Sequence, residues 1–421
     1  MIYVVSQYYR PLTNPPAVRM GHLVHGLIER YGAENIRVIT GRPNYPDGKL
    51  QPGFAGRAFR VTRGEHGETI HHLYEYATPF RGFYRKTWGL LTFAAGVFLY
   101  FIGRRLRPED RIFVTFGPAF PAYVFSWLCR WKKHLRYTLD VRDLWPEVAA
   151  GMGYLKPDSF TYRILARLSS RAYREADGLL ANSEGIQAYL KARPEGFDSV
   201  YLPNPVDTEL FRPLDVPRDG EAFTVVFSGA FSHYTDLMTL IEAVAVVQGL
   251  RLKLVGEGEA QPELERFIQA HGLGDRVQII PFVSDRTELV RIIRSADLCF
   301  ASLRDSPYLH YATPTKILEY MACGMPVLAL LNGPFAETLT RDQVALVQAP
   351  GKVDGLSHTL RRIMDQGFPD LRNPRSYIET HFSLGAFHRR LSDVLEGPMR
   401  PGPEASDSTR SATGAAPRPR G

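Results

Sequence analysis

Lys316 and Glu319 are the two charged side chains whose types and spacing point most directly to chemistry. They lie in residues 312–327, a stretch that predicts a helix. Thr313 is expected to cap this helix and Pro314 to occupy its first turn, which leaves free backbone N–H groups at the positive helix end. Lys316 adds a full positive charge there, so the segment from Thr313 to Glu319 predicts an anion site.

Glu319 follows Lys316 by three residues and shares its helix face, where the carboxylate could accept hydrogen bonds from ribose hydroxyls. The predicted contacts of a phosphate joined to a ribose are therefore Thr315, Lys316 and Glu319. Spacing alone leaves a second interpretation open, which is an ordinary amphipathic helix with a Lys–Glu pair.

The first half of the chain offers a second group of polar residues. Arg142 and Asp143 directly follow a predicted strand, while Asn14 and Arg19 lie in or near the connection between the first strand and the first helix. Ligands of doubly wound sheets bind at the carboxyl ends of the strands, so these positions are predicted to face a second substrate. His22 and His25 have no third ligand in view, which favours packing or surface roles over a metal site.

Short apolar runs alternate with amphipathic stretches, which is typical of parallel sheets covered by helices. Residues 203–213 are rich in proline and turn formers and predict a linker. The expected class is α/β with two Rossmann-like doubly wound domains facing a cleft. In the first half we expect strands at 2–6, 36–40, 111–115, 136–140 and 178–182, and helices at 16–31, 85–105, 119–132, 158–175 and 184–191. In the second half we expect strands at 223–228, 251–255, 277–280, 297–301 and 326–330, and helices at 235–247, 260–271, 286–295 and 314–323.

Four segments follow from this pattern. Residues 1–203 would form the first doubly wound domain, and residues 204–380 the second. Residues 381–397 would form a helix that packs back on the first domain. Residues 398–421, rich in Pro, Gly, Ser and Arg, predict a disordered tail.

Charge and cysteine content narrow the class of protein. Residues 1–205 hold 28 Lys and Arg against 17 Asp and Glu, so the first half carries a net charge of +11. This charge predicts an anionic partner such as lipid headgroups or a phosphorylated acceptor, although basic residues that only solvate a surface would give the same count. No nucleic-acid-binding module accompanies the charge. Three widely spaced cysteines argue against a disulfide framework, and the opening strand predicts no secretory signal.

Residues 88–102 are 15 uncharged, mostly apolar residues bracketed by basic ones. A spanning helix needs about 20 apolar residues, so we expect a helix that lies in the cytoplasmic leaflet of a membrane. A fully buried core helix is the alternative. The predicted membrane contacts are Tyr84, Arg85, Trp88, Leu91, Phe98, Arg104 and Arg105.

Taken together, these segments resemble the retaining glycosyltransferases of family 4, and in particular the branch that builds bacterial lipid-linked polysaccharides. The resemblance is carried in chain order by residues 6–11, 40–48, 140–147, 182–183, 203–207, 228–229, 254–258, 296–297 and 312–327. It covers the chain from the first strand to about residue 395. It implies two Rossmann-like domains, the architecture called GT-B, and a nucleotide sugar as donor. Residues 1–203 would then be the acceptor-binding and membrane-contacting domain, and residues 204–380 the nucleotide-sugar-binding domain.

The resemblance also implies roles in donor binding. Gly229 would let the backbone approach a diphosphate because it has no side chain. Gly256 and Glu257 would lie beside the nucleotide, and the backbone at Val283 would contact the base. No tightly bound metal or other cofactor is expected, since Lys316 and the helix termini supply the positive charge.

Two positions depart from the family pattern. The family usually has two glutamates with seven residues between them, and the first of these positions is Tyr311 here, which raises the hypothesis of a deoxygenated or N-acetylated sugar. The loop after Gly229 lacks the usual arginine or lysine, so His233 or backbone amides would have to compensate.

On the acceptor side, Asp143 is predicted to orient the acceptor hydroxyl, and Arg142 to bind acceptor phosphate or the leaving diphosphate. Asn14 and Arg19 are further acceptor contacts. A metal-binding Asp pair, as in single-domain glycosyltransferases, is an alternative that the two-domain pattern disfavours.

The sequence therefore predicts a retaining transfer of a sugar from a UDP sugar to a polyprenyl-diphosphate-linked acceptor in cell-surface polysaccharide synthesis. Asp143 and Lys316 are the predicted catalytic residues. The protein is expected in the cytoplasm, attached peripherally to the inner face of the membrane. A soluble acceptor and a non-catalytic nucleotide-sugar-binding role are the alternatives.

Overall fold

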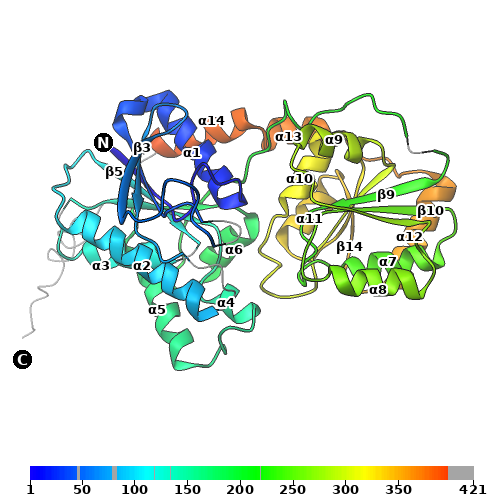
Figure 1. Ribbon diagram of the computed structural model, residues 1–421, viewed down its shortest axis with the longest axis horizontal. Helices are drawn as coiled ribbons and strands as arrows, with labels where there is room; N and C mark the ends of the chain where they lie inside the picture. The colour runs from blue at the N-terminus through cyan, green and yellow to red at the C-terminus, as the bar shows by residue number, and fades with distance from the viewer. Residues whose placement is uncertain (45–47, 78–82, 118, 133, 219, 397–421) are drawn as a thin grey trace, which may run out of the picture.

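The computed structural model describes residues 1–44, 48–77, 83–117, 119–132, 134–218 and 220–396; of Phe83, Tyr84 and Lys86 it describes the backbone alone. Two α/β domains lie side by side (Figure 1). The predicted tail from residue 398 lies outside the described residues.

The first domain contains an eight-stranded sheet in the order β3-β4-β2-β1-β5-β6-β7-β8. All neighbouring strands are parallel except β3 and β4, which form an antiparallel pair at one edge. The strands are β1 (Ile2–Val5), β2 (Ile36–Thr40), β3 (Phe59–Arg63), β4 (Thr69–Leu73), β5 (Arg111–Phe116), β6 (Tyr137–Val141), β7 (Gly178–Ala181) and β8 (Val200–Tyr201). Its helices are α1 (Pro15–Tyr31), α2 (Phe83–Ile102), α3 (Phe120–Leu128), α4 (Glu147–Gly151), α5 (Phe160–Glu175) and α6 (Glu184–Ala192), with a 3-10 turn η1 (Ala33–Asn35).

The second domain contains a six-stranded, fully parallel sheet in the order β11-β10-β9-β12-β13-β14. Its strands are β9 (Phe223–Ser228), β10 (Leu250–Val255), β11 (Val277–Ile280), β12 (Leu298–Ser302), β13 (Val327–Leu330) and β14 (Leu346–Gln348). Its helices are α7 (Leu237–Val246), α8 (Gln261–Ala270), α9 (Arg286–Arg294), α10 (Thr315–Ala322), α11 (Pro334–Arg341), α12 (Val353–Gln366) and α13 (Pro374–His381). The predicted α/β class with two doubly wound domains is confirmed.

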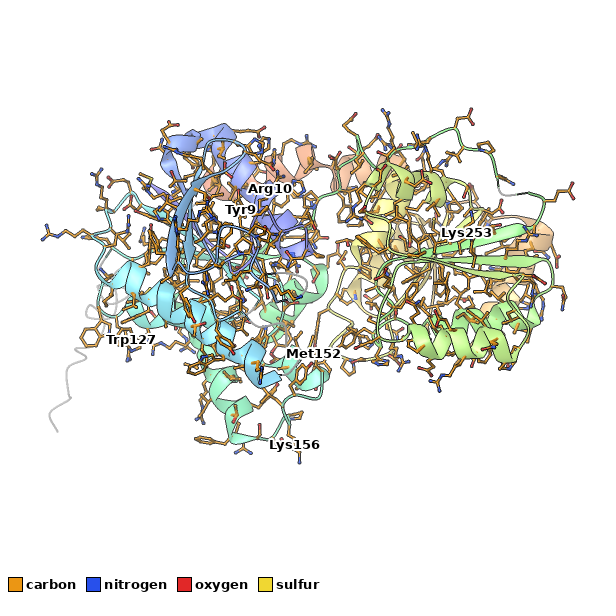
Figure 2. All side chains as sticks on the ribbon, in the orientation of Figure 1. Tyr9, Arg10, Trp127, Met152, Lys156 and Lys253 are labelled. Carbon is orange, nitrogen blue, oxygen red and sulfur yellow. The ribbon has the colours of Figure 1, made fainter. Side chains whose placement is uncertain are left out.

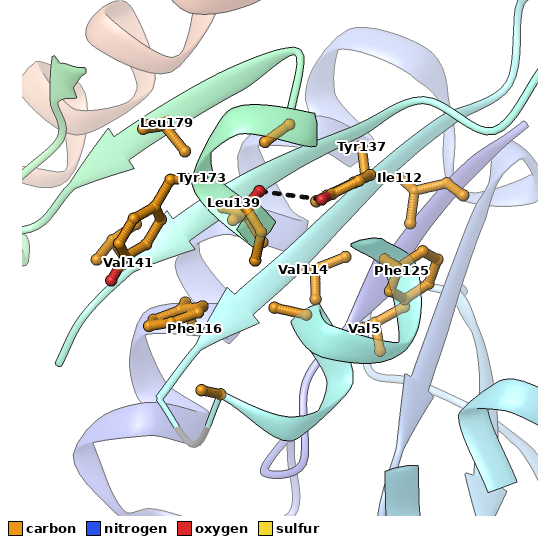
Figure 3. Close-up of a cluster of buried hydrophobic side chains, with 14 of the residues drawn as sticks. Val5, Ile112, Val114, Phe116, Phe125, Tyr137, Leu139, Val141, Tyr173 and Leu179 are labelled. Carbon is orange, nitrogen blue, oxygen red and sulfur yellow. Dashed lines mark hydrogen bonds between the residues drawn. The ribbon is translucent and has the colours of Figure 1, made fainter. Parts of the chain in front are cut away.

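The predicted apolar runs form the central strands of the two sheets. Helices cover both faces of a parallel sheet, so its strands are apolar on both sides. Figure 3 shows one such face in the first domain, where Phe125 of α3 and Tyr173 of α5 pack on strands β5 and β6. The hydroxyl of Tyr137 in this core donates a hydrogen bond of 3.0 Å to the carbonyl of Ala172, so its polar end is satisfied.

Helix α2 is neither fully buried nor membrane-spanning. Phe93, Val97 and Phe101 are completely buried against the sheet, whereas Trp88 is 57% and Leu99 69% exposed on the opposite side. Among the described residues, no helix combines the length and apolarity that crossing a bilayer requires.

The chain crosses between the domains twice. Residues 204–213 lead into the second domain, and α14 (Leu384–Glu396) returns to the first (Figure 1). The crossings touch where the N–H of Val206 donates to the carbonyl of Phe382 over 2.7 Å. Phe387, Leu391 and Leu395 of α14 then enter the same buried cluster as residues of α1.

Candidate functional site

A cleft of about 330 Å³ lies between the two domains. Both domains contribute to its walls at the carboxyl ends of their strands, where open α/β sheets bind ligands. The lining residues are Thr13, Pro15, Val18, Arg19, His22, Asn204 and Pro205 from the first domain and linker, and Ser228, Gly229, Ala230, Val255, Phe282, Val283, Arg286, Leu289, Thr315, Lys316 and Glu319 from the second.

Lys316 is the central cation of the second-domain wall. Its Nζ lies 3.8 Å from the centroid of the Phe227 ring, and a side chain at Gly229 would place its Cβ 2.8 Å from the same Nζ. Gly229 also has a φ of 134°, which disfavours any residue with a side chain. Burial lowers the pKa of Lys316 to about 7, opposed by the charge of Glu319. An anion that enters the cleft would therefore stabilise the charged form of Lys316.

Glu319 lines the same wall one helical turn further on. Burial raises the pKa of its carboxyl group, while Arg286 and, more weakly, Lys316 oppose the rise. The helix that carries both residues is fixed to β9, because the hydroxyl of Tyr320 accepts a hydrogen bond of 2.7 Å from the N–H of Ser228. Lys316 and Glu319 thus face the cleft from a rigid element.

The start of α10 differs from the sequence prediction. The helix begins at Thr315 with Pro314 as its N-cap, and no side chain caps it. Thr313 was predicted as the cap, but its Oγ1 is buried without a hydrogen-bond partner in the described structure. With Thr313 as the cap, Pro314 would be the first residue of the helix; the helix therefore starts one residue later than predicted. Thr315 lines the cleft at this helix end.

The other predicted donor contacts divide into two groups. Val283 lines the cleft, and Gly256 packs so tightly against the carbonyl of Gly229 that a Cβ would collide with it. Glu257 and His233 are not among the lining residues. Glu257 accepts a hydrogen bond of 3.4 Å from the N–H of Phe282, and His233 is 58% exposed and lies 3.9 Å from Glu259.

Arg19 lines the cleft but is largely used inside the protein. It is 2% exposed, and its guanidinium forms a bidentate ion pair with the equally buried Asp140. It also donates to Asn204 and to the carbonyl of Leu202, so it joins β6 to the linker. These contacts with three partners indicate that Arg19 positions the linker rather than binding an acceptor.

Asn14 was predicted as an acceptor contact but has a local structural role. Its side chain accepts a hydrogen bond of 3.3 Å from the N–H of Ala17 and caps α1. The residue is 6% exposed and is not among the lining residues. Thr13, Val18 and His22 from the same segment line the cleft instead.

Arg142 and Asp143 follow β6 but do not line the cleft. A Cβ at Gly117 would lie 2.5 Å from Oδ2 of Asp143, and burial raises the pKa of that carboxyl group against the lowering effect of Arg142. Nε and one terminal nitrogen of Arg142 are buried without a partner among the described residues. Arg142 therefore keeps unused donor capacity at the carboxyl end of β6.

Tyr311 lies on the first domain and not in the cleft. Its ring meets Tyr189 of α6 edge-on at 5.3 Å, and its carbonyl accepts a hydrogen bond of 2.5 Å from Ser183. A Cβ at Gly185 would lie 2.5 Å from its Cα. The position where the family pattern has a carboxylate is used here for contact between the domains.

The predicted membrane contacts gather on α2 and the connection after it. Trp88 and Leu91 are 57% and 40% exposed, and Arg85 and Arg105 are exposed as well. Phe98 is partly buried against Trp127, which lies at the periphery of the first domain (Figure 2). Arg104 folds back over the ring of Tyr100 at 4.4 Å; the side chain of Tyr84 lies outside the described residues.

Within the described ranges, no group of three or more His, Cys, Asp or Glu side chains is arranged to hold a metal ion. The expectation about cofactors is left untested by this finding.

Sequence reasoning missed Arg286, which lines the cleft beside Phe282 and Val283. A usable signal was present, because Asp285 caps α9 directly after the carboxyl end of β11. A strand followed by a helix cap and a cation is also the pattern that predicted the site at Lys316.

Comparison with known proteins agrees with this geometry. The family described as glycosyl transferases group 1 matches residues 213–380. A 2-deoxystreptamine glucosyltransferase of Streptomyces kanamyceticus is 23% identical over 236 residues, which is 54% of this chain and 59% of the relative. A lipopolysaccharide core biosynthesis glycosyltransferase, LpsD of Rhizobium meliloti, is 29% identical over 188 residues, 43% of this chain and 52% of the relative. The chain thus spans between half and three fifths of the length of these two relatives.

Two solved structures share the fold along nearly the whole chain. Sucrose-phosphate synthase of Thermosynechococcus elongatus matches with a TM-score of 0.69 at 18% identity, covering 94% of this chain and 98% of that one. HepE of Anabaena, solved in complex with UDP, matches with a TM-score of 0.65 at 17% identity, covering 94% and 99%.

Two Rossmann-like domains that face a cleft define the GT-B fold, which the two solved structures share. The second domain matches the family of group 1 glycosyl transferases, and the predicted resemblance to the family 4 type of bacterial polysaccharide synthesis is confirmed.

Proposed function

We propose that this protein transfers a sugar, with retention of its configuration, from a UDP sugar to a polyprenyl-diphosphate-linked acceptor in cell-surface polysaccharide synthesis. The observation that carries the proposal is the position of Lys316. Among the described residues it forms no ion pair within 4 Å, it lines the interdomain cleft at the start of α10, and Gly229 leaves open space beside its ammonium group. A diphosphate fits these requirements better than a neutral ligand does.

UDP is the proposed nucleotide, and no tightly bound cofactor is required. HepE, which shares the fold, was solved with UDP, and this supports the choice of nucleotide. Lys316 and the N–H groups at the start of α10 would bind the diphosphate, while Glu319 would accept hydrogen bonds from the ribose. The charge that develops on the departing diphosphate would then be stabilised without a metal.

Retention of configuration is proposed from the family resemblance. In that mechanism the departing diphosphate takes the proton of the acceptor hydroxyl on the same face of the sugar, and closure of the domains excludes water. The contact of Tyr311 with Tyr189 and Ser183 supports a closed arrangement of the two domains. Asp143 and Arg142 would act on the acceptor side of this arrangement.

The sugar is proposed to be N-acetylated or deoxygenated. The support is the tyrosine at position 311, which takes away a carboxylate that the family pattern directs to the sugar hydroxyls. A sugar with fewer hydroxyl donors needs fewer acceptors in the site.

The lipid-linked acceptor and the membrane location are supported by one exposed apolar surface, which we call the α2–α3–α5 face. Helix α3 packs against both α2 and α5, and the three helices lie on one side of the first domain (Figure 1). The exposed apolar residues of this face are Trp88, Leu91, Leu99, Ile102, Trp127, Trp131, Phe160 and Ile164. Large apolar residues flanked by arginines suit the inner surface of a cytoplasmic membrane. LpsD, a relative named for lipopolysaccharide core biosynthesis, supports the same assignment.

A soluble acceptor is the second candidate. It is favoured by one specific observation, the similarity to an enzyme named for 2-deoxystreptamine, and it would leave the α2–α3–α5 face without a role in catalysis.

The deciding experiment is a panel of UDP, GDP and dTDP sugars offered with polyprenyl diphosphate acceptors and with 2-deoxystreptamine, with products identified by mass spectrometry. We expect product from a UDP sugar and a polyprenyl diphosphate acceptor. Lys316→Ala is expected to abolish the product while circular dichroism and thermal unfolding stay unchanged. Full activity of this variant would refute the donor site, and product with 2-deoxystreptamine alone would favour the second candidate.

A further inference from the structure

The proposed donor site has one cation fewer than the family resemblance implies. The loop after Gly229, residues 230–236, contains no arginine or lysine. His233 was the predicted substitute, but it points to Glu259 and is not among the residues that line the cleft. A nucleoside diphosphate carries more than one negative charge, so a second cation is expected from another element.

Arg286 meets this requirement. It is the first residue of α9, it is exposed, and it lines the cleft together with Phe282 and Val283. Within the described structure it has no hydrogen bond and no ion pair within 4 Å. The other arginines of α9 are engaged, since Arg291 pairs with Glu288 at 3.3 Å and Arg294 donates to the carbonyl of Leu214.

Arg286 and Lys316 both act on the carboxylate of Glu319. The charge of Arg286 acts on the Glu319 carboxylate more strongly than the charge of Lys316 does. Arg286 lies on α9 and Lys316 on α10, so the two cations reach the cleft from different helices. The Glu319 carboxylate, proposed to hold the ribose, lines the cleft together with both.

The order of groups in a nucleotide fixes what each cation can reach. The α-phosphate is attached to the ribose through its 5′ carbon, and the β-phosphate lies one group further away. An arginine beside the ribose contact can extend a planar fork of N–H donors to the α-phosphate. Lys316, beside Gly229 and the start of α10, would then serve the β-phosphate.

We propose that Arg286 is the second cation of the donor site and binds the α-phosphate of the nucleotide. It would supply the positive charge that the loop after Gly229 lacks. This inference rests on the proposed function of the cleft.

The test is a ligand ladder of uridine, UMP and UDP, titrated by calorimetry at pH 7 against the wild type and single variants of the full chain. Arg286→Gln is expected to weaken UMP and UDP by roughly tenfold each and to leave uridine unchanged, because one charged hydrogen-bonding group is lost. Lys316→Gln is expected to weaken UDP more than UMP. Arg286→Lys is expected to retain part of the UMP affinity, since the charge remains.

Arg291→Gln is the matched control, because it removes a guanidinium from the same helix away from the cleft; it is expected to change none of the three affinities. Unchanged UMP and UDP affinities in Arg286→Gln would mean that Arg286 is only a solvated surface residue. An equal loss for uridine would assign it to the nucleoside and overturn the phosphate contact.

A parallel ladder of guanosine, GMP and GDP separates this inference from the proposed function. If the wild type prefers the guanine series, the UDP assignment fails. The affinities of Arg286→Gln for GMP and for guanosine then decide the role of Arg286. If the wild type binds no nucleotide of either series, both proposals are overturned.

Discussion

The ammonium group of Lys316 combines two opposed influences. Burial in the wall of the cleft lowers its pKa to about 7, whereas Glu319 one turn away favours the charged form. A lysine in free solution stays charged up to about pH 10.4. The protein therefore holds this cation near its titration point, where a bound diphosphate can shift it back to the charged form.

This arrangement predicts a pH dependence of UDP affinity. Above pH 7 the empty site loses its proton, and binding of UDP must take a proton up, so affinity should fall as pH rises from 7.5 to 9, by up to about tenfold per pH unit. Calorimetry in buffers of different ionisation enthalpy would detect the proton uptake. Lys316→Arg keeps its charge over this range and should bind UDP with little pH dependence; a slope equal to the wild type would assign the titration to another group.

The same shift has a consequence for stability. The unfolded chain holds the Lys316 proton up to a higher pH than the folded chain does, so the contribution of this group to the free energy of unfolding rises with pH between about 7 and 10.

Arg19 and Asp140 supply a second prediction at this scale. Arg19→Met should lower the free energy of unfolding by about 3–5 kcal/mol, because it leaves the carboxylate of Asp140 buried without its charge partner. Urea unfolding followed by circular dichroism measures the loss. The double variant Arg19→Met/Asp140→Leu should recover part of it, and a loss as large as in the single variant would show that the ion pair is not its source.

Single residues also show where sequence reasoning ends. Lys316, Glu319, Thr315 and Val283 were expected on the cleft and line it, because strand ends and helix starts are visible as patterns. Arg19 is buried in an ion pair with a residue 121 positions away, and Asn204 and Leu202, which complete its contacts, lie still further along the chain. Such partners depend on the folded arrangement and leave no local pattern.

At the scale of elements, the connection between β12 and α10 acts as a contact between the domains. Tyr308 in this connection lies against Gly151 of α4, where a Cβ would come within 2.6 Å of its ring, and Tyr311 packs on α6. The same connection leads directly into the helix start that carries Lys316. A change in how the domains meet is therefore transmitted to the donor site by a few residues of backbone.

We predict that Tyr311→Ala lowers kcat several-fold with a smaller effect on the affinity for UDP, since the ring contact with Tyr189 is lost while the donor residues remain. Stopped-time product assays and UDP calorimetry measure the two quantities. Tyr311→Phe keeps the ring and should behave like the wild type. A changed preference among UDP sugars in Tyr311→Ala, with kcat preserved, would instead support a direct role in sugar choice.

Most elements of both sheets were predictable, because buried parallel strands are short apolar runs. The hairpin of β3 and β4 was not, since Phe59 and Val61, the apolar residues of its edge strand, face solvent at 50% and 48% exposure and the strand has no buried apolar run. Strand β14, with three residues, is too short for its pattern to stand out.

At the scale of the whole molecule, the charge of the first half and the α2–α3–α5 face belong to the same domain. Large exposed apolar residues gathered in one region of a folded domain mark an interaction site. The sequence predicted the helix and its basic flanks, but the contributions of Phe160 and Ile164 depend on the packing of α5 beside α3.

The corresponding prediction concerns binding to vesicles. Trp88→Glu combined with Leu91→Glu should abolish most co-sedimentation with vesicles that contain anionic lipid, because both apolar contact and charge attraction are weakened. Val246→Glu is the control, as it places the same charge at a 52% exposed apolar position of the second domain. Retention of vesicle binding by the double variant would contradict the assignment of this face.

The return of α14 to the first domain has a consequence for synthesis on the ribosome. Phe387, Leu391 and Leu395 complete a core whose other members, such as Met20 and Val24, are made first. The apolar side of α1 must therefore wait, uncovered, until the whole second domain has left the exit tunnel. Separate domains usually fold in order from the N-terminus during synthesis. Here the first domain cannot complete its core before α14 has been made. The first domain is expected to be the last to reach its native core and the more dependent on chaperones during translation.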